Sequence, residues 1–113
     1  MTRLFSGDDG QSHFEDIDLD LNKTEVGRLS NPFSVENMSF GVIEGIDEVP
    51  WHNTDSPQYV VILQGAMEIE VGNGTKRTLS AGDILLAEDM TGQGHITRAI
   101  NKQKWHFLIA PAK

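Results

Sequence analysis

Short runs in which apolar and polar residues alternate, each closed by a turn signal, recur along this chain and constrain it to an all-β fold. Met67–Val71 alternates with a period of two and leads to Asn73-Gly74, a dipeptide typical of tight hairpin turns. The other predicted strands are Asp16–Leu21, Ser39–Glu44, Gln58–Leu63, Lys76–Leu79, Asp83–Ala87, His95–Ile100 and Trp105–Ile109. No segment sustains a helical period, so the pattern predicts an antiparallel sandwich or barrel.

The length of 113 residues fits one domain with an N-terminal extension. Residues 1–38 hold a polar turn, a strand in which acids alternate with aliphatic residues, and a connection that contains Pro32. We expect them to form an extension whose edge strand or strands pack on the barrel. Residues 39–113 hold the remaining predicted strands and form the barrel itself.

Charge and cysteine content exclude several classes of function. The formal net charge is 9 − 17 = −8, which repels phosphate backbones and anionic lipid, so neither nucleic acid nor membrane is an expected partner. The absence of cysteine removes disulfides, thiolate metal sites and cysteine nucleophiles. No apolar stretch reaches the roughly 18 residues of a membrane helix, and the N-terminus lacks the apolar segment of a secretory signal. We therefore expect a cytoplasmic protein.

The stretch from Gly45 to Gly65 resembles the first motif of the cupins, G-x5-H-x-H-x3-E-x6-G. His52, Thr54, Gln58 and Gly65 fall at the spacing of its last four fixed positions. Gly45 lies one residue further from His52 than the motif's first glycine does. Thr54 therefore stands where the motif has its second histidine, and Gln58 stands where it has glutamate.

The stretch that begins at Gly82 resembles the second cupin motif, G-x5-P-x-G-x2-H-x3-N. Glu88 occupies the proline position, and His95 follows two residues later than the motif's histidine. The chain is thus similar to short single-domain bacterial cupins, a group for which few reactions are assigned. The resemblance implies a single jelly-roll β-barrel of antiparallel strands, and single-barrel cupins usually dimerise, so a homodimer is expected.

In cupins that bind metal, motif histidines and a carboxylate hold one divalent transition metal, Fe, Mn, Ni or Zn. Carried over by position, the resemblance implies a metal site built from His52, Gln58 and His95. Thr54 and Gln58 replace an imidazole and the only negative charge, and an amide oxygen is a weak neutral ligand. A bound metal and a barrel without metal therefore both stay open.

Strand parity places a set of these residues on one inner face. The predicted cavity is lined by His52, Thr54, Gln58, Val60, Ile62, His95 and Thr97. Such a mixed wall, apolar with a few hydrogen-bonding groups, is typical of small-molecule pockets. Glu88, which opens the glycine-rich loop together with Asp89, is either a general base at the barrel rim or part of a solvated turn.

Three functions follow from these features. The first is a barrel that binds a small-molecule ligand in a polar pocket, with no reaction assigned. The second is a metal-dependent enzyme, a dioxygenase or an isomerase, acting on a small organic acid, sugar or ring compound. The third is a structural subunit of an oligomer, in which the strand face that carries Tyr59, Val61 and Leu63 forms an interface or receives the N-terminal segment.

Overall fold

The computed structural model describes residues 1–113 and contains twelve strands, one 3₁₀ turn at Ile100–Lys102 and no α-helix. The strands are β1 (Thr2–Ser6), β2 (Ser12–Asp16), β3 (Leu21–Thr24), β4 (Gly27–Ser30), β5 (Ser39–Ile43), β6 (Glu48–His52), β7 (Gln58–Gln64), β8 (Ala66–Val71), β9 (Lys76–Ser80), β10 (Ile84–Glu88), β11 (His95–Ala99) and β12 (Trp105–Pro111). The predicted all-β fold is confirmed. No helix is long and apolar enough to cross a bilayer.

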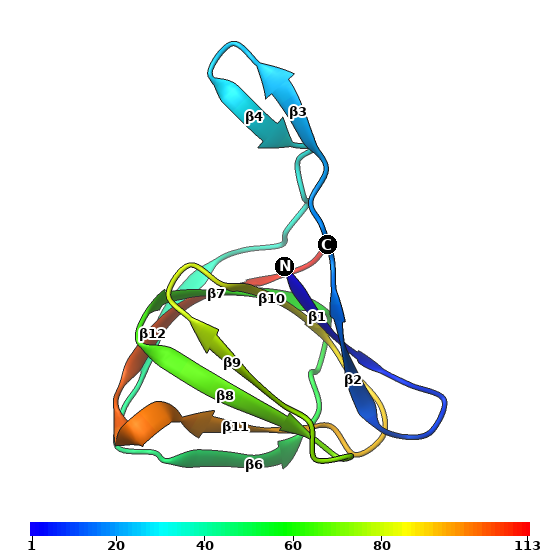
Figure 1. Cartoon of the computed structure of the whole chain (residues 1–113), viewed down its shortest axis with the longest axis vertical. Helices are drawn as coiled ribbons and strands as arrows, with labels where there is room; N and C mark the ends of the chain where they lie inside the picture. The colour runs from blue at the N-terminus through cyan, green and yellow to red at the C-terminus, as the bar shows by residue number, and fades with distance from the viewer.

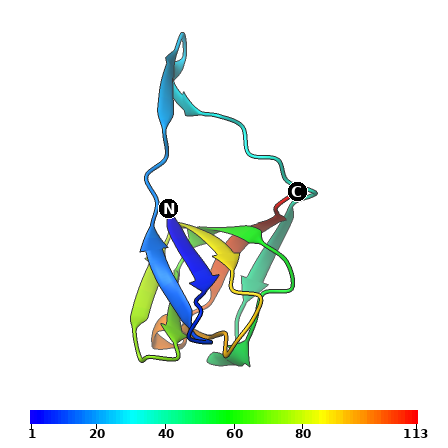
Figure 2. The same ribbon diagram turned by 90° about the vertical axis from the view of Figure 1, so that its right-hand side faces the viewer.

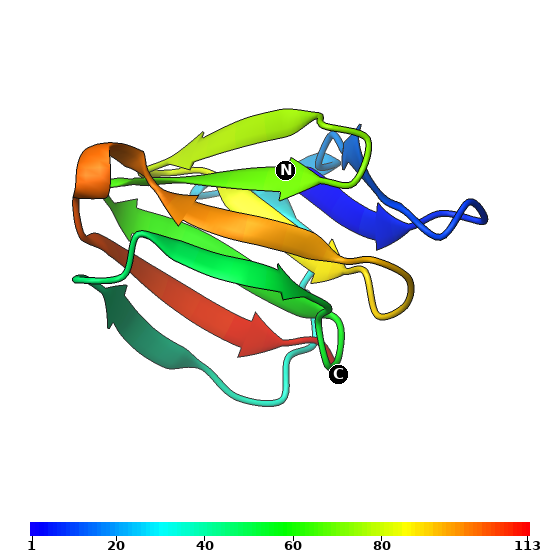
Figure 3. The ribbon, with the colours of Figure 1, turned by 90° about the horizontal axis from the view of Figure 1, so that it is seen from below.

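Two sheets form the walls of the barrel (Figure 1). The larger sheet has six strands in the order β2-β1-β10-β7-β12-β5, and the smaller has four in the order β6-β11-β8-β9. Seen from below, strands of the smaller sheet lie in front of strands of the larger one (Figure 3). All pairs are antiparallel except β1 with β10, where Thr2 pairs with Leu85 in parallel register.

The core lies between the sheets and follows from the alternation along the strands. In β8, Met67, Ile69 and Val71 are buried, while the intervening Glu68 and Glu70 face outward. The buried core cluster comprises Leu4, Val60, Ile62, Met67, Ile69, Val71, Leu79, Leu85, Ala87 and Trp105. Residues from both sheets therefore share one apolar interior, and the N-terminal strand contributes Leu4 to it.

The predicted strand Asp16–Leu21 is wrong. β2 ends at Asp16, residues 17–20 are irregular, and β3 begins at Leu21. The alternation of acidic and aliphatic residues would give a strand two distinct faces, but residues 17–20 have no neighbouring strand with which to pair. Residues 17–20 bond to the barrel backbone only through Ile17: its N–H donates to the carbonyl of Met1 at 2.8 Å, and its carbonyl accepts from the terminal ammonium of Met1 at 3.0 Å. The N-terminal strands are instead β1 and β2, which pair with each other across the Gly7–Gly10 turn and extend the larger sheet.

Residues 21–30 form a hairpin of β3 and β4 that the sequence pattern does not predict, and we call it the arm. Figures 1 and 2 show the arm projecting from the barrel, beyond the end at which the two chain termini lie. Its strands pair in register from Leu21 with Ser30 to Thr24 with Gly27. Every residue of β3 is exposed, so the arm is not packed against its own barrel.

Candidate functional site

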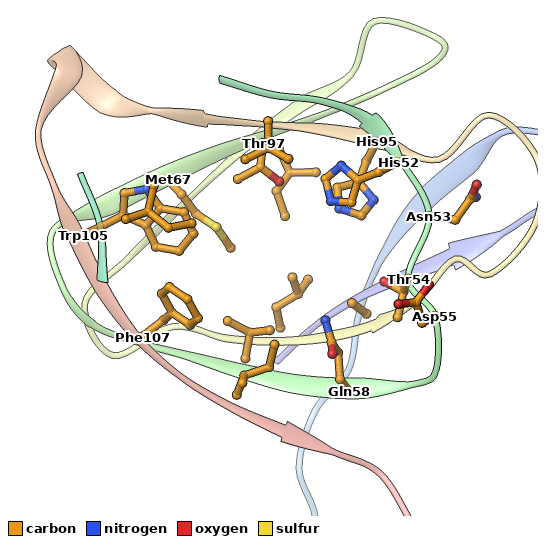
Figure 4. Close-up of a pocket in the computed structure, with 17 residues that line it drawn as sticks. His52, Asn53, Thr54, Asp55, Gln58, Met67, His95, Thr97, Trp105 and Phe107 are labelled. Carbon is orange, nitrogen blue, oxygen red and sulfur yellow. The ribbon is translucent and has the colours of Figure 1, made fainter. Parts of the chain in front are cut away.

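A cavity of about 340 Å³ lies between the two sheets (Figure 4). Six of the seven residues predicted to line it do so: His52, Thr54, Gln58, Val60, His95 and Thr97. Ile62 does not line the cavity. Its side chain has the predicted inward direction, but it is 1% exposed and lies in the packed core cluster, where apolar neighbours fill the space.

The two cavity histidines come from neighbouring strands of the smaller sheet. His52 ends β6 and pairs in register with His95 at the start of β11, and their ring centroids lie 4.3 Å apart. A register shift follows between His95 and Thr97. Sequence reasoning places His52 but misses β6 itself, because Pro50 interrupts the strand pattern. Proline is tolerated there because β6 is the edge of its sheet.

Hydrogen bonds fix the tautomer that each neutral histidine adopts. The Nδ1 atom of His52 lies 2.7 Å from the carbonyl oxygen of Pro50, and the Nδ1 atom of His95 lies 2.6 Å from a carboxylate oxygen of Asp89. Because both partners accept hydrogen bonds, each Nδ1 carries the proton. In the neutral form of each ring, Nε2 is then the acceptor atom, and no hydrogen bond within the protein occupies it.

Asp89 is the main functional residue that sequence reasoning misses. Its side chain is completely buried, not part of a solvated turn. One carboxylate oxygen accepts bonds from His95 and from Ser12 at 2.8 Å, and the other accepts a bond from Thr54 at 3.2 Å. Strand alternation could have identified this position. Asp89 follows Leu85 and Ala87 at a spacing of two residues, so the three side chains point to the same, buried side of the sheet.

The loop between β10 and β11 is held against the end of β6. The side-chain amide of Asn53 donates to the carbonyl oxygens of Asp89, Thr91 and Gly92 at 3.1 to 3.3 Å. Gly94 adopts a φ of +76°, and a Cβ atom there would lie 2.0 Å from the carbonyl oxygen of His52. Only glycine permits this approach, which brings His95 beside His52.

Glu88 does not line the cavity, where the first of its two expected roles, a general base at the barrel rim, would need it. Glu88 alternates with the buried Ala87 and Asp89 and points to the outer side of the sheet, where it forms an ion pair with Arg3. Arg3 also contacts Glu15 at 2.8 Å. Hydrogen bonds from Arg3 to Glu88 and then to Glu15 raise the pKa of the guanidinium. The carboxylate behind the cavity is therefore Asp89.

The residues present do not complete a resident metal site. The Thr54 hydroxyl, which occupies the position of the second motif histidine, donates to Asp89. Gln58 reaches the cavity from β7, across from the two histidines (Figure 4). The chain gathers no group of three or more histidine, aspartate or glutamate side chains around a common point. The donors at the motif positions are two imidazoles and one neutral amide, which is a weak set for a divalent transition metal. Asp55, a carboxylate in the cavity lining, is exposed and does not gather with both histidines.

No family model matches this chain. The chain is 29% identical over 99 residues to "Oryzines biosynthesis cluster protein J" of Aspergillus oryzae, of which it spans about half (51%), while 82% of this chain is covered.

Two solved structures show the same arrangement of strands. An RmlC-like cupin with a double-stranded β-helix fold from Methanocaldococcus jannaschii superposes with a TM-score of 0.54 at 15% identity, covering 87% of this chain and 93% of that one. A cupin-2 domain protein from Shewanella frigidimarina gives 0.51 at 22% identity, covering 67% and 69%.

Proposed function

From the premise that this chain has the cupin fold, we propose that it binds a small organic molecule in the cavity between its sheets. The observation that carries the proposal is the pair of oriented imidazoles. His52 and His95 stand side by side, with each Nδ1 bonded and each Nε2 free to accept a hydrogen bond. Gln58 on the opposite wall adds a donor and an acceptor.

The charge of the lining indicates the class of ligand. Ten of the seventeen lining residues are hydrophobic, and neither lysine nor arginine is among them. Asp55 supplies a carboxylate to the lining, and Asp89 places a second one behind His95. An anion would meet these charges without a cationic partner. The cavity therefore suits an uncharged, partly apolar molecule that carries hydroxyl or amide N–H groups.

A second candidate is a metal-dependent enzyme of dioxygenase or isomerase type. One observation favours it: histidines that ligate metals usually donate their other ring N–H to a carboxylate or a carbonyl oxygen, as His95 and His52 do. The donor set described above is incomplete for a resident metal. We therefore derive no reaction step through one, and binding without metal stands first. The third possibility, an oligomer subunit without a ligand, predicts indifference to the cavity residues.

Thermal-shift measurements with a fragment library test the binding proposal. The library pairs neutral alcohols and amides with the carboxylates of matching shape. We expect the neutral members to raise the melting temperature of the wild type, because a ligand that binds only the folded state stabilises it. His52→Ala and His95→Ala should remove that rise, whereas His13→Ala, whose ring bonds Asp9 outside the cavity, should keep it. A preference for the carboxylates, or a rise that survives both cavity substitutions, would contradict the proposal.

Metal analysis by mass spectrometry separates the first two candidates. Untagged wild type should be measured beside His95→Ala, because a histidine tag would bring metal of its own. The binding proposal expects a substoichiometric metal content in both proteins. About one transition-metal ion per chain in the wild type, lost in a folded His95→Ala variant, would favour the metal-dependent enzyme instead.

A further inference from the structure

The cavity has two chemically different ends, and the register of the smaller sheet places them apart. His95, at the start of β11, pairs with Val71 of β8, whereas Ala99, at the end of β11, pairs with Met67. The step along β11 from His95 to Ala99 spans about 13 Å, because a strand rises about 3.3 Å per residue. His95 and Met67 therefore lie at opposite ends of this wall.

The larger sheet repeats the same division. Gln58, at the start of β7, pairs with Pro111 of β12, whereas Ile62, further along β7, pairs with Phe107. Figure 4 shows the two groups of side chains at opposite sides of the cavity. We call the part lined by Met67, Trp105 and Phe107 the apolar end, and the part lined by His52, His95 and Gln58 the polar end.

The apolar end is built from two aromatic rings and a thioether. The rings of Trp105 and Phe107, both on β12, have centroids 5.0 Å apart and are tilted by 41°. Met67 brings its thioether to the same end (Figure 4). The one carboxylate in the lining, Asp55, lies at the polar end. Aromatic rings pack favourably on tilted rings and on methionine sulfur, so this end suits the flat ring of a ligand.

Gly41 of β5 keeps the apolar end open. It pairs in register with Phe107 and shares its inward side with Ile43, which lines the cavity. A Cβ atom at Gly41 would overlap the tip of the Phe107 ring. The backbone does not require glycine there, because Gly41 is not among the glycines with a positive φ. What Gly41 supplies is room: the Phe107 ring lies against β5 and leaves the space in front of it to the cavity.

The size of the cavity limits the ligand to a small molecule. Its volume of about 340 Å³ is near the lower limit of small-molecule pockets and equals that of roughly eleven water molecules. That suits a single ring with a short head group. A primary amide head has two N–H donors for the Nε2 atoms of His52 and His95, and a carbonyl oxygen that accepts from the amide of Gln58.

We infer that the ligand is a single-ring aromatic molecule with a neutral hydrogen-bonding head, and that Gly41 determines this specificity. The head lies at the polar end and the ring at the apolar end. The inference rests on the proposed function, because the histidines that bind the head are those of that proposal. Binding of the head and binding of the ring are nevertheless separable, since different side chains provide them.

NMR titration of the isotope-labelled protein with three amides tests the inference. Benzamide, cyclohexanecarboxamide and propionamide share one head and differ in carrying an aromatic ring, a saturated ring or a short chain. We expect the wild type to bind benzamide about tenfold or more tightly than propionamide, and about threefold or more tightly than cyclohexanecarboxamide. Benzamide should shift the indole N–H signal of Trp105 and leave that of Trp51, which does not line the cavity.

Gly41→Ala supplies the decisive variant. It should weaken benzamide binding by about tenfold and leave propionamide binding unchanged, because the displaced Phe107 ring would fill the apolar end alone. Ser39→Ala, at an exposed position of the same strand outside the cavity lining, is the matched control and should bind all three amides as the wild type does. Combining Gly41→Ala with Phe107→Leu should restore the room, so that both ring amides bind again.

The outcomes separate this inference from the proposed function. Propionamide binding as tightly as benzamide in the wild type, or benzamide binding that withstands Gly41→Ala, would overturn the inference and leave the proposed function standing. So would the loss of propionamide from a folded Gly41→Ala variant. Cyclohexanecarboxamide binding as tightly as benzamide would refute the aromatic preference. No binding of any amide to the wild type would overturn both proposals. If Gly41→Ala failed to fold, the wild-type preference and the Trp105 signal would decide.

Discussion

At the scale of single residues, the carboxylate of Asp89 does most to define the candidate site. It joins Ser12 of β2, Thr54 after β6 and His95 of β11, so three segments that are distant in the sequence meet on one side chain. A buried charge is tolerated when hydrogen bonds replace its lost hydration, and these three bonds do so. Asp89 also fixes the ring orientation of His95 and leaves its Nε2 atom to the cavity.

Asp89→Asn tests this role. An amide keeps the shape of the carboxylate but presents a donor nitrogen to neighbours that are donors themselves. We expect the free energy of unfolding to fall by about 1–3 kcal/mol, and binding of neutral fragments to weaken because His95 loses its fixed orientation. Urea denaturation measures the first effect and thermal shift the second. Asp55→Asn, an exposed carboxylate at the same cavity, is the control. Equal stability of the two variants would refute the proposed role.

Only some of the residues of the site could be predicted from the sequence. The motif spacing brings His52, Gln58 and His95 to one cavity, because a strand's parity determines which side chains share a face. Parity does not say where a cavity ends, so Ile62 was assigned to a wall that it does not form. The sequence also did not predict which of the two adjacent acids, Glu88 or Asp89, points into the barrel. That depends on the neighbours packed around β10, which the sequence pattern does not specify.

At the scale of elements, strands with a clear period and a nearby partner were predictable. β7, β8, β9, β10, β11 and β12 begin and end within two residues of their predicted limits. β1 and β6 were not predicted, because each has a distant partner in the barrel and Pro50 also interrupts the pattern of β6. β1 pairs with β10, and β6 pairs only with β11. The arm escaped prediction for a related reason: its hairpin has no apolar face turned to its own core.

The outer side of the smaller sheet concentrates charge around Arg98. Its guanidinium contacts Glu70 at 2.6 Å, Glu48 at 2.8 Å and Glu68 at 3.4 Å. The bonds to Glu70 and then to Glu48 raise the pKa of Arg98, so it stays charged at every pH at which the protein is handled. One cation therefore holds three strands, β6, β8 and β11, together across their outer face.

Arg98→Met should lower the urea midpoint at low salt, because three glutamates would face one another without a cation between them. The loss should shrink as salt is added, since screening weakens repulsion between exposed charges. Lys76→Met is the control, because Lys76 touches only Glu70, at 3.9 Å. A loss for Arg98→Met that does not depend on salt would contradict the explanation by repulsion between the glutamates.

At the scale of the whole molecule, stability and association are expected to be linked. If two copies of the chain associate through the outer side of the larger sheet, where Phe40, Leu108 and Val61 are neighbours in register, the folded dimer is favoured by mass action over the unfolded monomers. None of these three residues lines the cavity, so this linkage does not require a ligand.

The melting temperature of the wild type should therefore rise with protein concentration, and calorimetry over a wide concentration range measures that rise. In Phe40→Asp the melting temperature should be lower and nearly independent of concentration, because that variant unfolds as a monomer. Ile46→Asp, at an exposed apolar position in the turn between β5 and β6, is the control and should follow the wild type. A wild-type melting temperature that is flat with concentration would argue against coupled folding and association.

The parallel pairing of β1 with β10 has a consequence for how the protein is made. The ribosome releases β1 first, yet the strand that receives it emerges only after most of the chain has been translated. Closing so long a loop is slow, so the N-terminal hairpin docks late. Ser12, the β2 donor to Asp89, arrives in that same event. Until that hairpin docks, we expect a nascent chain to lack one of the three side-chain bonds that hold Asp89 behind the cavity.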